Sequence, residues 1–189
     1  MGYVLLGISS VVGVSGSVSP VGLTGAAMQM FTHGTITGLL FLLVGMVYDK
    51  AHTRHIPDMS GLANRMPITA VVFVIAGLAS LGLPGTSGFV SELLVFLGTF
   101  EVWAWLTALG VLGIVITAGY ILWTLQRVFF GPQAQRFADI RDASFVEAVP
   151  MAALVIAIMV VGIYPAVFTD VFQLGLEPIV ESLQLSGAP

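Results

Sequence analysis

Apolar residues in this sequence form about five long segments separated by short polar stretches. Helices satisfy every backbone hydrogen bond inside a lipid bilayer, so the pattern predicts an all-α, polytopic transmembrane helix bundle. We expect a single transmembrane domain over residues 1–189, with an amphipathic tail from Asp170. The predicted membrane segments are residues 1–14, 21–48, 67–100, 103–127 and 149–169.

The first two segments differ in how they begin. The second follows Ser19-Pro20, which combines a capping hydroxyl with a proline suited to the first helical turn. The first would extend only about 21 Å, short of the ~30 Å hydrocarbon core. It also lacks the basic residues that open a signal peptide. We therefore expect it to be the remaining half of a longer helix, and the chain to be truncated at its N-terminus.

The third segment contains a predicted helix break. A straight helix of its length would extend about 50 Å, which is too long for one crossing. Pro84, near its middle, cannot donate a backbone hydrogen bond, and Gly85 and Gly88 permit a non-helical backbone. The sequence therefore predicts two half-helices joined around Pro84, Gly85 and Gly88.

The basic residues predict the orientation of the bundle. If the segments cross the membrane alternately, all Lys and Arg residues fall on one side, with Ser17 and Glu177 on the other. By the positive-inside rule, the loops after Tyr48 and Phe130 are then cytoplasmic and the carboxyl terminus is outside. The six basic residues are Lys50, Arg54, Arg65, Arg127, Arg136 and Arg141.

Composition supports a membrane location and limits the chemistry. Hydrophobic residues make up 57% of the chain and charged residues 8%, whereas about a quarter of an average globular chain is charged. The absence of Cys excludes disulfides and cysteine-ligated iron-sulfur clusters on this chain. We recognise no basic cluster for nucleic acid, no nucleotide-binding loop and no metal-ligand spacing. His52 and His55 are predicted to be solvated loop residues.

The apolar segments contain one acid and one imidazole, Glu92 and His33. A charge at membrane depth costs roughly 2.5–3.5 kcal/mol on insertion scales, so such residues normally face the bundle interior and have a function. Glu92 lies just beyond the predicted break, where unpaired backbone groups can hold water. The alternative is an acid exposed at the outer interface.

His33 lies near the middle of the second segment, and an imidazole can gain and lose a proton near neutral pH. His33 therefore suits a proton relay. The alternative is a neutral histidine that is hydrogen-bonded between helices. From the residues alone, the chain is expected to handle protons or ions and to carry out no bond chemistry.

Three stretches of the sequence resemble a known family. They are residues 51–54 (AHTR), 61–67 (GLANRMP) and 79–93 (ASLGLPGTSGFVSEL). Together they resemble the chain M (subunit 4) type of antiporter-like subunit in NADH:quinone oxidoreductase, complex I. In that family the matching helix is discontinuous, its acid, here Glu92, is a proton-channel residue, and a central histidine matches His33.

The resemblance implies a proton-translocating subunit in a bacterial inner membrane, with the other membrane subunits of complex I as its partners. NADH, FMN, iron-sulfur clusters and quinone are expected on the whole complex, and none of them on this chain. Family members have about fourteen transmembrane helices, and this chain resembles the last five. The alternative is a subunit of a multisubunit cation/proton antiporter or a membrane-bound hydrogenase.

Overall fold

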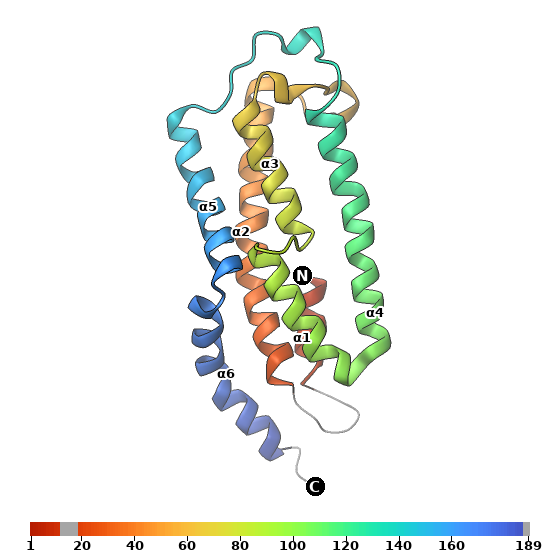
Figure 1. Ribbon diagram of the computed structural model, residues 1–189, viewed down its shortest axis with the longest axis vertical. Helices are drawn as coiled ribbons and strands as arrows, with labels where there is room; N and C mark the ends of the chain where they lie inside the picture. The colour runs from red at the N-terminus through yellow and green to blue at the C-terminus, as the bar shows by residue number, and fades with distance from the viewer. Residues whose placement is uncertain (12–18, 187–189) are drawn as a thin grey trace.

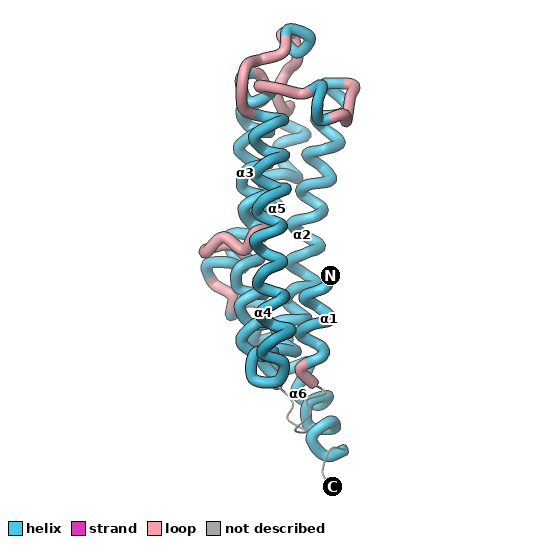
Figure 2. The backbone as a smooth tube through the Cα atoms, turned by 90° about the vertical axis from the view of Figure 1, so that its right-hand side faces the viewer, coloured by secondary structure: helices cyan, strands magenta, loops and turns pink. Residues whose placement is uncertain are grey.

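The computed structural model describes residues 1–11 and 19–186, which form an elongated bundle of α-helices (Figures 1 and 2). The described residues contain no β-strand, so the predicted all-α class is confirmed. The α-helices are α1 (Gly2–Ser9), α2 (Pro20–Ala51), α3 (Pro67–Ser80), α4 (Ser87–Phe129), α5 (Phe145–Ile163) and α6 (Ala166–Ser186). Short 3-10 helices occupy Ile56–Asp58, Leu62–Asn64 and Gln135–Phe137.

Helix α2 begins where the sequence predicts. The Ser19 hydroxyl accepts a hydrogen bond from the Gly22 backbone N–H at 3.3 Å, and Pro20 is the first helical residue. The side chain thus satisfies one of the four N–H groups that a helix start leaves without a partner.

The predicted break separates α3 from α4. Gly82 has a φ of +71°, and the N–H groups of Gly82 and Leu83 donate to the carbonyls of Ala79 and Leu78 at 3.2 and 3.1 Å. This is a Schellman C-cap, in which the left-handed residue is usually glycine. Gly85, with a φ of +92°, completes the turn.

Two of the three residues predicted at the break lie within it, and the third does not. Pro84 and Gly85 are between the helices, whereas Gly88 is in the first turn of α4. A Cβ at Gly88 would overlap the Ala79 carbonyl oxygen. Gly88 therefore allows the start of α4 to pack closely against the end of α3.

Helix α4 folds back on itself at Trp103, which has a non-helical backbone (φ −137°, ψ 60°). Figure 1 shows its two parts running in opposite directions. The part before Trp103 continues α3 across the bundle, and the part after it is the next crossing. The predicted boundary between residues 100 and 103 is therefore present as a sharp kink without a separate loop.

The predicted helix over residues 149–169 is wrong at both ends. Helix α5 begins earlier, at Phe145, because Ser144 and Glu147 form a capping box. It ends at Ile163, and α6 starts at Ala166 after Tyr164 and Pro165. The final crossing is therefore a second broken helix.

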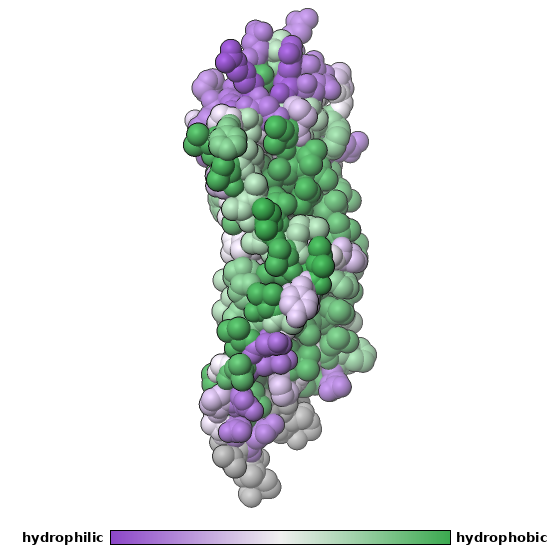
Figure 3. All heavy atoms as spheres, turned by 60° about the vertical axis from the view of Figure 1, so that its left-hand side comes forward, coloured by the Kyte–Doolittle hydropathy of each residue, from purple (hydrophilic) through white to green (hydrophobic). Residues whose placement is uncertain are grey.

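The surface separates into an apolar belt and two polar ends (Figure 3). By length and composition α2, α4 and α5 can each cross a membrane, and α3 is a shorter apolar helix. The two loops at the upper end of Figure 1, together with the last helical turns that lead into them, carry the basic residues, as predicted, and α6 with Glu177 extends toward the opposite end. Ser17 lies outside the described residues.

Candidate functional site

Glu92 lies in the second turn of α4, directly beside the helix break. The residue is 7% exposed, so it is not an acid at an open interface of this chain. A Cβ built on Gly82 would lie 2.5 Å from Glu92 Oε2. The absence of a side chain at Gly82 thus gives the carboxylate room against the break, in addition to allowing the positive φ.

His33 and Glu92 line the same cavity, which has a volume of about 140 Å³. His33 is half-buried on α2, and Ser80 and Gly88 of the break region also border the cavity. A space of this size is large enough for several water molecules. The structure therefore brings together the two site residues predicted from the sequence.

Other polar residues of the cavity were missed by the sequence analysis. They come from three different helices, α1, α2 and α4, and are Tyr3, Gln29, Thr32, Thr117 and Tyr120. Gln29 could have been found, because it lies one helical turn before His33 on the same face of an otherwise apolar helix. The Tyr3 hydroxyl donates to the Gly110 carbonyl at 3.1 Å, which joins α1 to the second part of α4.

A buried hydrogen bond joins α2 to α4 at the wall of the cavity. The Ser91 hydroxyl contacts the Gln29 side-chain oxygen, and it also lies 3.0 Å from the Gly88 carbonyl. One helical turn away, Thr32 and Ser87 are buried and their hydroxyl oxygens have no protein partner. Buried hydroxyls normally bond to protein or to ordered water, so this region suits bound water.

Beyond Gln29, toward the start of α2, the same two helices touch through glycine. A Cβ on Gly25 would lie 2.6 Å from the Val95 backbone nitrogen, and one on Gly98 would overlap Gly22. Backbones this close leave no room for water between them. The seam between α2 and α4 is thus polar beside Glu92 and sealed toward the start of α2.

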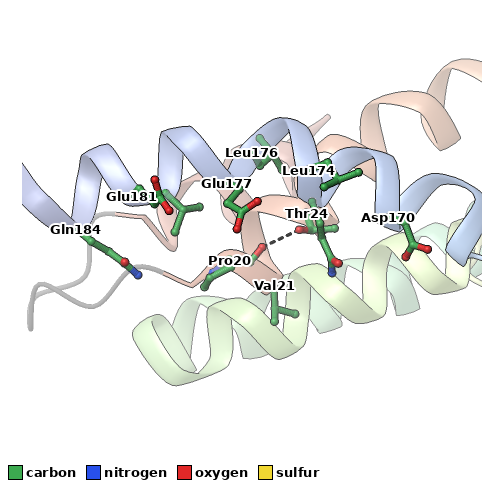
Figure 4. A pocket seen from close by; sticks show the side chains of 11 residues that line it. Pro20, Val21, Thr24, Asp170, Leu174, Leu176, Glu177, Glu181 and Gln184 are labelled. Atoms are coloured by element: carbon green, nitrogen blue, oxygen red, sulfur yellow. Dashed lines mark hydrogen bonds between the residues drawn. The ribbon is translucent and has the colours of Figure 1, made fainter.

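A second hollow, of about 650 Å³, lies between the start of α2 and α6 (Figure 4). It is lined by the exposed carboxylates of Asp170, Glu177 and Glu181, with Thr24 on the opposite wall. None of its lining residues borders the Glu92 cavity. The structure therefore separates these exposed acids from the buried one.

The cavity has the parts needed for proton exchange: a buried carboxyl, an imidazole, hydroxyls and space for water. Within residues 1–11 and 19–186, no group of three His, Asp or Glu side chains could hold a metal ion. The arrangement of the described side chains supports proton transfer through hydrogen bonds.

Comparisons with known proteins identify the family. The family described as NADH:quinone oxidoreductase/Mrp antiporter, TM, matches residues 1–117. NADH-quinone oxidoreductase subunit M of Rhodobacter capsulatus is 39% identical over 183 residues, which cover 96% of this chain and 34% of that protein. This chain thus spans about a third of the length of that relative.

Two solved structures share the fold. A chain of respiratory complex I from Thermus thermophilus with bound NADH matches with a TM-score of 0.86 and 30% identity. The match covers 100% of this chain and 37% of the complex I chain. A chain of the Mrp complex from Dietzia sp. DQ12-45-1b has a TM-score of 0.84 at 19% identity, covering 97% of this chain and 41% of its own. The second likeness concerns the fold alone.

Proposed function

Because this chain belongs to the NADH:quinone oxidoreductase/Mrp antiporter transmembrane family, we propose that it is part of a proton-translocating membrane subunit of an NADH:quinone oxidoreductase. Its role there is to provide a half-channel in which Glu92 and His33 exchange protons through water in their shared cavity. The observation that carries the proposal is the burial of Glu92 in that cavity, beside a broken helix.

The chemistry follows from the side chains present. A carboxyl group at membrane depth can bind and release a proton, and hydroxyls and water can pass that proton along a chain of hydrogen bonds. The helix break contributes backbone groups that are free to hold water. Electron transfer belongs to other subunits in this proposal, since this chain contains no Cys to ligate a cluster. Its partners are the other membrane subunits of the complex.

The proposal is tested by replacing Glu92 with glutamine in the assembled oxidoreductase. The amide preserves the shape and hydrogen-bonding capacity of the carboxyl but cannot release a proton at neutral pH. We expect assembly to be retained, while proton translocation and the quinone reduction coupled to it fall on the order of tenfold. Vesicle acidification and quinone reduction would be measured in the same membranes.

The matched control is Asp170→Asn, which makes the same change at an exposed acid on α6. It should leave both activities close to wild type. If the Glu92→Gln complex instead keeps a normal ratio of protons to electrons and a normal turnover, then Glu92 is only structural, and the chain is a membrane scaffold.

A second candidate is a subunit of a cation/proton antiporter, which is favoured by the family description because it also names the Mrp antiporter. The two functions differ in what drives proton movement. Proton exchange that requires added Na⁺ and proceeds without an electron donor would support the antiporter, whereas movement that requires NADH oxidation would support the oxidoreductase.

A further inference from the structure

The second helix break lies against the first one. Gly162, in the last turn of α5, packs on the segment that joins α3 to α4. A Cβ at Gly162 would overlap the carbonyl oxygen of Gly85 and the backbone carbon atoms of Thr86. Figure 1 shows the lower end of α5 beside this segment. The overlapping atoms are backbone atoms, so no rotation of a side chain could relieve the clash.

A separate contact places the second break at the level of the proton site. Phe168, in the first turn of α6, stacks on Phe31 of α2 with 4.3 Å between ring centroids. Phe31 lies two residues before His33 on α2. The junction between α5 and α6 is therefore fixed both to the first break and to the helix that carries the imidazole.

Both sides of the Gly162 contact are packed. Ile158 and Val161 of α5 are 0% and 2% exposed, and Ile158 packs in a core cluster with residues of α2 and α3. On the side of the first break, Thr86 is 3% exposed. A side chain at position 162 should therefore change the position of Thr86 relative to α5.

Displacement of the break would reach Glu92 directly. Thr86 is the residue that precedes α4, and Glu92 lies in the second turn of that helix, with Oε2 held against Gly82 on the other side of the break. Moving this segment changes the position of the carboxyl group relative to the cavity. We propose that Gly162 is a positioning residue, which sets the geometry of the first helix break and thereby places Glu92 for proton transfer. This inference rests on the proposed function.

The test is Gly162→Ala in the assembled oxidoreductase. Because carbon atoms pack about 3.5–4.0 Å apart, we expect Thr86 to move by roughly 1 Å in the structure of the variant complex. A misplacement of that size can reduce a rate by up to about 100-fold, and we expect coupled quinone reduction and proton translocation to fall at least several-fold. The control is Gly175→Ala on α6, where an added Cβ meets no atom within 4 Å.

A double variant separates positioning from general damage. If Gly162 acts through Glu92, adding Gly162→Ala to Glu92→Gln should cause no further loss of activity. The inference would be overturned if the activity losses of the two single variants multiplied in the double variant. It would also be overturned if Thr86 were unshifted in Gly162→Ala, or if that variant had wild-type activity. Failure of Gly162→Ala to assemble would overturn it as well, because a folding defect does not depend on the carboxyl group. If Glu92→Gln alone is fully active, the proposed function fails, whereas the position of Thr86 still reports whether Gly162 sets the break.

Discussion

At the scale of single residues, the buried pair of Gln29 and Ser91 forms a polar link between α2 and α4. Gln29 is 7% exposed and Ser91 is fully buried. A buried polar group that loses its partner costs about 1–3 kcal/mol, more than an intact hydrogen bond contributes. The pair therefore makes the register of the two helices specific at the point where they carry His33 and Glu92.

This reasoning predicts the effect of Ser91→Ala. The change leaves the Gln29 side-chain oxygen without its hydroxyl donor and should reduce the stability of the assembled protein by about 1–3 kcal/mol. Thermal denaturation of the purified complex would measure the loss. Ser182→Ala is the control, because Ser182 is exposed on α6 and its hydroxyl bonds only within its own helix.

The double variant Gln29→Leu with Ser91→Ala tests whether the unpaired Gln29 oxygen causes this loss of stability. Replacing both partners by apolar side chains can be nearly neutral, so this variant should be more stable than Ser91→Ala alone. Equal stability of the two would mean that the hydrogen bond does not hold the helices in register.

At the scale of helices, α3 is capped by a residue far away in the sequence. The Asp142 carboxylate accepts hydrogen bonds from the backbone N–H groups of Ile68 and Thr69 at 2.6 and 3.2 Å. Beside it, Lys50 forms an ion pair with Glu147 at 3.0 Å. These contacts tie the starts of α3 and α5 to the end of α2. They hold the half-helix that leads into the first break.

Asp142→Ala should therefore loosen the start of α3. Loss of a capping carboxylate typically costs about 0.5–2 kcal/mol, and the N–H groups of Ile68 and Thr69 would lose their acceptor. We expect faster hydrogen–deuterium exchange in the first turn of α3. Asp139→Ala, at an exposed acid of the same loop, should not change it. Exchange that is unchanged in Asp142→Ala would show that the cap does not stabilise this end.

The two helix breaks show what sequence can and cannot predict. The first was predictable because Pro84 stands among glycines in a segment too long for one crossing. The second was missed because Pro165 is a lone proline in an apolar run, and a proline of this kind often only kinks a helix. The Gln29–Ser91 pair and the Asp142 cap could not be predicted, since each depends on how segments distant in the sequence pack together.

At the scale of the whole molecule, charge separates along the long axis of the bundle. The basic residues lie at one end, in the loops between α2 and α3 and between α4 and α5 and in the last turns of α2 and α4, and the acids of α6 lie toward the other end (Figures 1 and 3). Cytoplasmic loops of membrane proteins are enriched in Lys and Arg. The chain crosses the membrane twice between these two loops. Helix α3 with the first part of α4 makes one crossing, and the second part of α4 makes the other. The two loops must therefore lie on the same side.

Cysteine labelling can test this topology directly, because the chain has no native Cys. His52→Cys and Glu177→Cys place single thiols at two exposed positions, one at each end of the bundle. In vesicles of known orientation, a membrane-impermeant reagent should label position 52 only from the cytoplasmic side and position 177 only from the opposite side. The apolar belt between the two positions must lie in the bilayer, so the two ends of the bundle must be on opposite sides of it. Labelling of both positions from the same side would contradict this topology.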